Sequence, residues 1–160
     1  MKMKKKNLKF LERKLEMKIN IKKLDNCVSL PIRAHATDAG ADVFATKQIT
    51  LEPKERYAMP LGFCLEIPKG YMGIIVTKSS MFKNGIYAHI PPVDSGYTGE
   101  CHALLENANK DNIYIEKGTK VGQLIILPIE YPSFNEVMEL NVTERGSGAF
   151  GSTGSKLNEN

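Results

Sequence analysis

Apolar and polar residues alternate in short runs along most of the chain, a pattern typical of strands that bury one face. Ile19 and Ile21, with polar neighbours, begin this pattern. Turn signals such as Pro68-Lys-Gly separate the runs, because proline presets φ and glycine accepts a positive φ. The later runs predict strands over Val43–Thr46, Gln48–Leu51, Gly62–Ile67, Met72–Thr77, Ile86–Ile90, Cys101–Leu105, Asn112–Ile115, Leu124–Ile129 and Val137–Val142.

Only Ser79–Lys83 predicts a helical turn inside this pattern. Many short strands at near-regular spacing predict an all-β domain built as a sandwich, jelly roll or barrel. A chain of 160 residues is long enough for one such domain with its own core. No apolar run approaches the roughly 20 residues that span a membrane, and none follows the basic N-terminus as a secretory signal would require.

The net charge of +4 is concentrated at the N-terminus. Residues 1–16 hold seven basic and two acidic side chains, so the remaining residues carry a net charge of −1. We therefore expect residues 1–16 to be an extension, either disordered or a short helix with Leu8, Leu11 and Leu15 on one face. Translation from Met17 is a second interpretation, and an arm that binds nucleic acid or an anionic surface is a third.

Neither the cysteines nor the histidines have the spacing of a metal site. The cysteines are odd in number and widely separated, which predicts reduced thiols in a cytosolic protein. The histidines lack the i,i+4 spacing of a helical metal motif, so we interpret them as ordinary surface or core residues. These residues are Cys27, Cys64, Cys101, His35, His89 and His102.

The segment Arg145–Gly154 combines four glycines with an arginine, a phenylalanine and three hydroxyl side chains. Glycine lets backbone N–H groups approach phosphate oxygens, Arg145 can bind them bidentately, and Phe150 can lie on a flat ring. A flexible Gly/Ser tail is the alternative, but such a tail needs neither side chain. We therefore predict that residues 143–160 form a lid that closes over a phosphorylated ligand, next to a β domain over residues 17–142.

Four further short polar segments interrupt the predicted strands, and we call them polar islands. The first contains Asp42, just before an apolar strand, and the second is Thr77-Lys-Ser-Ser80, at the start of the predicted helical turn. The third is Val93–Glu100, a predicted hairpin turn, and the fourth contains Gln123, just before another apolar strand. Each island alone is an ordinary turn or surface segment. Their order and spacing in one chain carry the information.

Together with the tail, these islands resemble the five ordered motifs of the trimeric dUTPases, from about Met17 to Gly154. The resemblance implies a distorted jelly-roll or barrel-like domain and a homotrimer whose three active sites each draw motifs from more than one chain. It implies hydrolysis of dUTP to dUMP and pyrophosphate with Mg²⁺, which limits uracil incorporation into DNA and supplies dUMP for dTMP synthesis. A cytoplasmic location is expected, or the host cytoplasm or nucleus if the source is viral.

The same resemblance implies a role for each motif. Asp94 would deprotonate the attacking water, Tyr97 would stack on the deoxyribose and exclude a 2′-hydroxyl, and the backbone over residues 94–99 would read uracil. Mg²⁺ would be held mainly by the triphosphate and waters, with Asp42 reaching it through water. Phe150 would cover the uracil as the tail closes. The expected phosphate-binding and lid residues are Lys78, Ser79, Ser80, Gln123, Arg145, Gly151, Ser152 and Thr153.

The chain departs from the family pattern at several positions. Lys78 stands where arginine is usual, which replaces a forked phosphate contact by a point charge. Gly96 replaces a second acidic residue, Ala149 replaces a glycine of the tail, and Pro91-Pro92 stiffens the approach to Asp94.

Three other functions remain open at this point. A dCTP deaminase shares this fold and needs a glutamate base, for which this chain has Leu104 at the corresponding position and Glu106 two residues further on. The glycine-rich tail argues against it. A non-catalytic nucleotide-binding trimer would not need Asp94. A nucleic-acid-binding protein would have to rely on residues 1–16, since the remainder is nearly neutral.

Overall fold

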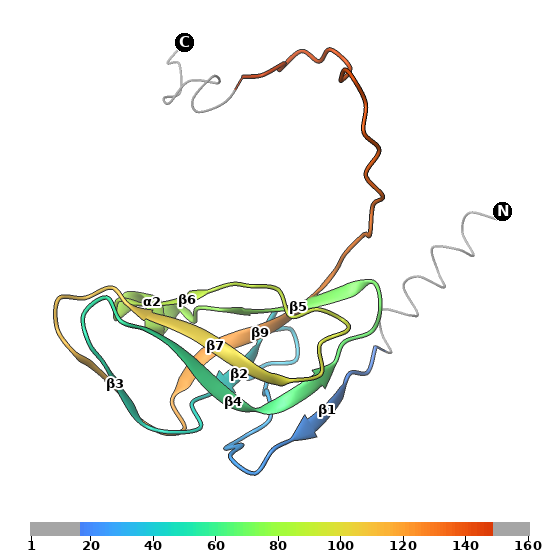
Figure 1. Ribbon diagram of the computed structural model, residues 1–160. Helices are drawn as coiled ribbons and strands as arrows, with labels where there is room; N and C mark the ends of the chain where they lie inside the picture. The colour runs from blue at the N-terminus through green and yellow to red at the C-terminus, as the bar shows by residue number, and fades with distance from the viewer. Residues whose placement is uncertain (1–16, 149–160) are drawn as a thin grey trace. The chain divides into compact units, whose positions relative to one another are not determined.

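The computed structural model describes residues 17–148 (Figure 1). Within this range there are nine strands and one short helix. No helix in this range is long and apolar enough to cross a membrane. The elements are β1 Asn20–Lys23, β2 Ala41–Phe44, β3 Ile49–Leu51, β4 Arg56–Glu66, β5 Tyr71–Val76, α2 Ser79–Lys83, β6 Ile86–His89, β7 Glu100–Asn107, β8 Ile113–Ile115 and β9 Lys120–Pro128.

All strand pairs are antiparallel, and the strands form three sheets. The largest has the order β1-β4-β7-β6, the second β2-β9-β5, and the third pairs β3 with β8. Figure 1 shows β4 and β7 side by side along most of their length. The predicted all-β, jelly-roll-like class is confirmed, and so is the predicted helical turn over Ser79–Lys83.

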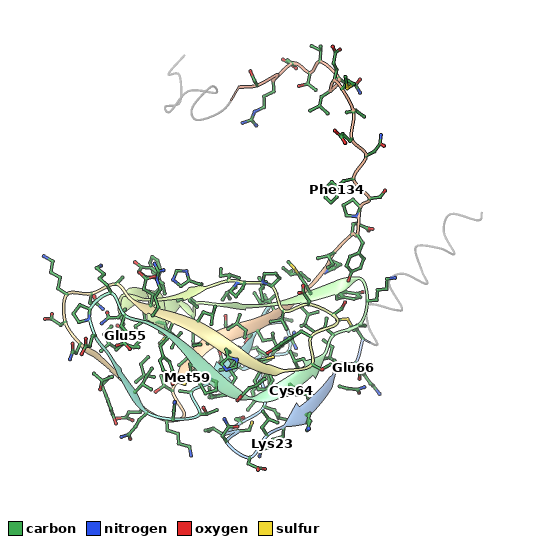
Figure 2. All side chains as sticks on the ribbon, in the orientation of Figure 1. Lys23, Glu55, Met59, Cys64, Glu66 and Phe134 are labelled. Carbon is green, nitrogen blue, oxygen red and sulfur yellow. The ribbon has the colours of Figure 1, made fainter. Side chains whose placement is uncertain are left out.

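One face of each major strand supplies the core. Along β7, buried and partly buried residues alternate strictly, as the period-2 pattern predicts. Met59 and Phe63 of β4 and Leu105 of β7 are almost completely buried. In Figure 2, Met59 lies among the packed side chains, whereas Lys23 and Glu66 lie at the margin, where both are exposed. This core fixes the loops that carry the polar islands.

Strand β4 begins six residues before the predicted Gly62–Ile67 strand. The added first half contains Pro60, which is unfavourable in a regular strand because proline cannot donate a ladder hydrogen bond. The structure accommodates it by shifting the register with β7 between Pro60 and Cys64. A bulge of this kind is one of the few places where a strand tolerates proline.

The chain from Tyr131 onward forms a separate unit, described up to residue 148. The predicted strand at Val137–Val142 is wrong: residues 131–148 contain no strand. Side chains such as Phe134, labelled in Figure 2, and Met138 are almost fully exposed. The alternation of apolar residues was present, but no strand in the described part of the chain pairs with this segment. The proposed extension at residues 1–16 and the rest of the lid at residues 149–160 lie outside the described range.

Candidate active site

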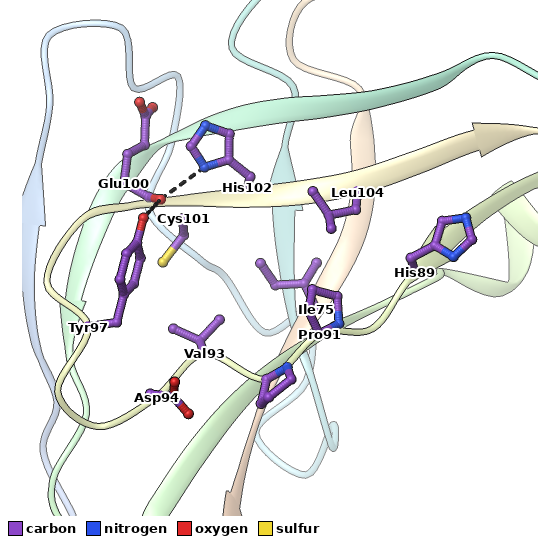
Figure 3. A pocket seen from close by; sticks show the side chains of 11 residues that line it. Ile75, His89, Pro91, Val93, Asp94, Tyr97, Glu100, Cys101, His102 and Leu104 are labelled. Atoms are coloured by element: carbon purple, nitrogen blue, oxygen red, sulfur yellow. Dashed lines mark hydrogen bonds between the residues drawn. The ribbon is translucent and has the colours of Figure 1, made fainter.

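A cavity of about 210 Å³ opens between β7 and the segment that connects β6 to β7. In Figure 3, Cys101, His102 and Leu104 lie on β7, and Pro91, Val93, Asp94 and Tyr97 lie on the connecting segment. Two sequence-predicted residues, Asp94 and Tyr97, thus share one cavity. The complete lining is Ile75, His89, Pro91, Pro92, Val93, Asp94, Tyr97, Glu100, Cys101, His102 and Leu104.

Backbone hydrogen bonds fix the position of Asp94. The residue before it, Val93, forms a β-bridge with Gly73 of β5 through N–O distances of 2.7 and 2.9 Å. The turn then closes with the Tyr97 N–H donating to the Asp94 carbonyl at 3.0 Å. The Asp94 side chain itself is exposed, so its carboxylate can meet both water and a ligand in the cavity.

Tyr97 is held against the end of its own hairpin. Its hydroxyl donates to the Glu100 carbonyl at 3.0 Å, drawn as a dashed line in Figure 3. Gly99 permits this arrangement, because a Cβ at that position would lie 2.5 Å from the Tyr97 hydroxyl oxygen. The ring therefore has a defined place beside Asp94, as a stacking residue requires.

Gly99→Ala is expected to displace the Tyr97 ring. With dUTP, the substrate that the resemblance to the dUTPases implies, we expect KM to rise by about three- to tenfold and discrimination against UTP to fall, because the resemblance assigns the stacking on the sugar to this ring. Gly96→Ala is the matched control, since a Cβ there meets no atom within 4 Å. Steady-state kinetics of both variants with dUTP and UTP test this. Equal behaviour of the two variants would contradict the role given to Gly99.

Two other ionisable side chains of the cavity, Cys101 and Glu100, are constrained by burial or by hydrogen bonds. Burial raises the pKa of the Cys101 thiol to about 11, so the thiol is uncharged near neutral pH. The Glu100 carboxylate accepts the Gly62 N–H at 2.9 Å and the Asn26 side-chain amide at 3.2 Å. Nδ1 of His102 lies 2.9 Å from the Glu100 carbonyl oxygen (Figure 3). Of the two carboxylates that line the cavity, Asp94 is the exposed one, and it is therefore our candidate base.

A second group of predicted residues surrounds the carboxylate of Asp42, which is almost fully buried. Asp42 Oδ1 accepts Lys78 Nζ at 2.9 Å and Gln123 Nε2 at 3.0 Å. Lys120 Nζ, from a residue that is not among those predicted from the sequence, lies 2.8 Å from Asp42 Oδ2. One carboxylate thus gathers two ammonium groups and one amide; we call these four residues the Asp42 cluster.

The strand register brings the Asp42 cluster together. Asp42 in β2 stands directly opposite Gln123 in β9, and its backbone also bridges to Ile32. Gly40 allows the close approach to β9, because a Cβ there would lie 2.8 Å from the Gln123 Cβ. Lys78 arrives from the end of β5, immediately before α2. In the sequence, Asp42, Lys78 and Gln123 stand in separate islands more than 30 positions apart.

The pKa of Asp42 predicts a pH-dependent contribution to stability. Burial opposes ionisation, but the donors Lys120, Lys78 and Gln123 outweigh it and lower the pKa from 3.8 to about 2. A carboxyl with a lowered native pKa stabilises the fold above its unfolded pKa and loses that effect as the pH falls through the native pKa. The contribution of Asp42 is therefore complete above about pH 4 and lost toward about pH 2.

We expect Asp42→Asn to lower the free energy of unfolding by about 2 kcal/mol at neutral pH, and by progressively less on acidification below about pH 4. Urea unfolding at several pH values measures the difference. The exposed Asp111 provides the control variant Asp111→Asn, for which little change is expected. If the difference in the free energy of unfolding between wild type and Asp42→Asn stayed constant down to about pH 2, this interpretation of the cluster would be contradicted.

The cavity and the Asp42 cluster are distinct. Among the described residues that line the cavity there is no lysine, and Asp42 and Gln123 are also absent from it. Ser79 and Ser80 are exposed at the start of α2, next to Lys78 of the cluster. One chain therefore presents a cavity with an exposed carboxylate, and separately a set of cationic and amide donors suited to phosphate.

Of the predicted lid, Arg145 is within the described residues. Its Nε donates to the Gly148 carbonyl at 3.1 Å, and the Gly148 N–H donates back to the Arg145 carbonyl at 3.1 Å. These contacts form a compact turn. The remaining lid candidates, Phe150, Gly151, Ser152 and Thr153, lie outside the described residues and stay predictions.

No group of three or more acidic, cysteine or histidine side chains between residues 17 and 148 could cage a metal ion. Oδ1 of Asp42 accepts hydrogen bonds from Lys78 and Gln123, and Oδ2 is contacted by Lys120. A carboxylate has about four acceptor positions, so a metal-bound water could still be accepted. The residues therefore fit an Mg²⁺ ion held mainly by a substrate's phosphates, and do not fit a protein-made metal cage.

Comparison with known proteins agrees with this geometry. The family model for dUTPase matches residues 26–154. The chain belongs to the dUTPase family. The deoxyuridine 5'-triphosphate nucleotidohydrolase of Clostridium kluyveri is 36% identical over 141 residues, covering 86% of this chain and 99% of that protein. The deoxyuridine 5'-triphosphate nucleotidohydrolase of Leifsonia xyli is 38% identical over 129 residues, covering 78% of this chain and 85% of that protein.

Solved dUTPase structures show the same fold. A variant of the Staphylococcus bacteriophage 80alpha dUTPase with dUpNHpp superposes with a TM-score of 0.81 at 28% identity, covering 88% of this chain and all of that one. A variant of the phage phi11 dUTPase of S. aureus, described with a structural Mg(II) ion, has a TM-score of 0.73 at 25% identity and covers 79% of this chain and 100% of that one.

In this chain, Glu106 is not placed to act as the glutamate base that a dCTP deaminase needs. Its carboxylate lies 2.6 Å from His89 Nε2 and 3.0 Å from Arg56 Nε, and these two groups hold its pKa below the usual value. Glu106 is not among the residues that line the cavity, whereas Leu104 is. The position at which a deaminase needs a carboxylate therefore carries an apolar side chain.

Proposed function

We propose that this dUTPase hydrolyses dUTP to dUMP and pyrophosphate by attack of water on the α-phosphorus, with Asp94 as the general base. The observation that carries the proposal is the exposed Asp94 carboxylate in the same cavity as the fixed Tyr97 ring. A positioned carboxylate can hold a water and accept its proton as the bond to phosphorus forms. Family membership supplies the substrate class.

Tyr97 supports selection of a deoxyribonucleotide. Its hydroxyl is tied to the Glu100 carbonyl, and Gly99 leaves the room that this position of the ring needs, so the ring has a defined place beside the sugar. The sugar stacks on the ring, and a 2′-hydroxyl finds no room. The hairpin backbone over residues 94–99 reads the uracil edge, and Phe150 covers the base when the lid closes.

The phosphates bind at the Asp42 cluster and the start of α2. Lys78 supplies a positive charge, Gln123 an amide donor, and Ser79 and Ser80 hydroxyl donors. Arg145, Gly151, Ser152 and Thr153 of the lid contact the terminal phosphate. When bound, Mg²⁺ neutralises phosphate charge and orients the α-phosphate, with Asp42 holding one of its waters.

The separation of cavity and cluster supports a shared active site in a homotrimer. Because one chain's cavity contains Asp94 without the phosphate donors, a complete site forms when a second copy brings its Asp42 cluster to the cavity. Closed cyclic symmetry repeats such a contact around the ring. The exposed apolar side chains at Met138, Leu140 and Val142 agree with a chain that buries more surface on assembly. The free cysteines Cys27, Cys64 and Cys101 favour a reducing compartment such as the cytoplasm.

Pyrophosphate release from dUTP, UTP, dTTP and dCTP, each with Mg²⁺, tests the proposed function. We expect rapid release from dUTP alone, with dUMP as the other product. Ammonia release from dCTP would identify a deaminase. Binding of dUTP without turnover would identify a non-catalytic binding protein.

A further inference from the structure

Lys120 is part of the Asp42 cluster although its position in the strand would not predict it. We propose, on the basis of the proposed function, that Lys120 is a positioning residue for triphosphate binding: by sharing the Asp42 carboxylate, it keeps the Lys78 ammonium group available to the phosphates. Lys120 acts through Asp42, at 2.8 Å from Oδ2, and Lys78 lies 2.9 Å from Oδ1 of the same side chain.

A β-bulge directs Lys120 to this position. Lys120 and Gln123 are three residues apart in β9, so in a regular strand their side chains would point to opposite faces. The register between β2 and β9 shifts between Val43 and Phe44: Val43 pairs with Gly122, but Phe44 pairs with Lys120. The extra residue of β9 re-aims Lys120 to the face on which Gln123 meets Asp42. Bulges are frequent beside active sites for this reason.

The second lysine, Lys120, gives the Asp42 cluster a net positive charge. Two ammonium groups around one carboxylate leave one positive charge in excess, beside the Gln123 amide. The Asp42 side chain is 4% exposed, whereas the side chains of Lys78 and Lys120 are 27% and 48% exposed, so the two lysines are much more accessible to a ligand than the carboxylate is. An incoming triphosphate therefore meets an attractive site.

Without Lys120, Lys78 would be the single cation on a buried carboxylate. Asp42 would then hold Lys78 more tightly, because it would have lost its other cationic partner, and the pair would be neutral. The expected consequence is weaker binding of the triphosphate in the ground state and in the transition state alike. Such a loss raises KM and leaves kcat nearly unchanged.

The test compares neutral and charged substitutions of Lys120. Lys120→Met and Lys120→Gln remove the charge, Lys120→Arg keeps it, and Lys117→Met removes an exposed lysine from the turn just before β9. For each variant, kcat and KM with dUTP and the calorimetric affinity for dUpNHpp are measured. The melting temperature of each variant shows that it folds.

We expect both neutral variants to raise KM and the dUpNHpp dissociation constant by about tenfold, with kcat within about threefold of wild type. Lys120→Arg should restore both constants, and Lys117→Met should change neither. Unchanged constants in the neutral variants, a fall in kcat alone, or failure of arginine to restore binding would overturn the proposal. Wild type that binds dUpNHpp but turns over no dUTP would refute the proposed function while the titrations still decide on Lys120. Wild type that binds no dUpNHpp would overturn both.

Discussion

Asp94→Asn is expected to lower kcat for dUTP by about 10³-fold, because the amide cannot accept the proton of the attacking water. The substitution keeps the size of the side chain and its hydrogen-bonded turn, which is made by backbone groups. We therefore expect the affinity for dUpNHpp to change by less than about threefold, since binding and catalysis separate at this residue. Single-turnover kinetics and calorimetry measure the two effects.

The exposed Asp111, in the segment between β7 and β8, provides the matched control. Asp111→Asn removes the same charge from a position outside the cavity, and full activity is expected. Because Asp94 is also exposed, its substitution should leave the melting temperature unchanged. Retention of most activity in Asp94→Asn would show that another group activates the water.

Mixing two inactive variants is expected to restore activity. In one, Asp94→Asn removes the base; in the other, Lys78→Ala with Gln123→Ala removes donors of the Asp42 cluster. Each alone should lose on the order of a hundredfold or more in kcat/KM. We expect restoration because the Asp94 and the Asp42 cluster of one site come from different copies in the proposed trimer. With equal amounts of both chains and random mixing, about a quarter of the sites then contain an intact Asp94 and an intact cluster.

Co-expression of differently tagged chains and purification through both tags isolates the mixed assemblies. A mixture of Asp94→Asn with Asp94→Ala is the control, because neither chain can supply a base and no site can recover. Mixed assemblies as inactive as their parents would show that the cavity and the Asp42 cluster of the same chain act together. The complementation experiment thus decides between shared and single-chain sites.

Local patterns predicted the parts of the fold that depend on local chemistry. Ser79–Lys83 forms the expected helix, and Asp94 and Tyr97 share a cavity because three residues of a tight turn cannot separate them. The order of the islands along the chain identified the family, which the comparisons confirm. None of these inferences required knowledge of which strands pair.

Features that depend on pairing were beyond the sequence. Lys120 joins Asp42 only because β9 carries a bulge, which no alternation of residues indicates. The first half of β4 was missed because Pro60 opposes a regular strand and is tolerated at a register shift. At Val137–Val142 the alternation was correct for a strand, but a strand also needs a neighbour, and none pairs with it in the described chain.

The family resemblance implied that each site draws motifs from more than one chain, but it did not say that Asp94 separates from the Asp42 cluster, because this follows from which sheet each island joins. Asp42 and Gln123 belong to the sheet β2-β9-β5, and Asp94 lies in the connection between β6 and β7 of the larger sheet. The sequence grouped all these residues by their expected ligand. The structure divides them between the cavity and the cluster.

Hydrolysis of dUTP in water enriched in a heavy oxygen isotope, followed by mass spectrometry of both products, tests the central claim most directly. Attack of water on the α-phosphorus predicts one labelled oxygen in dUMP and none in pyrophosphate. Label in pyrophosphate with unlabelled dUMP would place the attack on the β-phosphorus and contradict the proposed reaction, and so would the absence of hydrolysis.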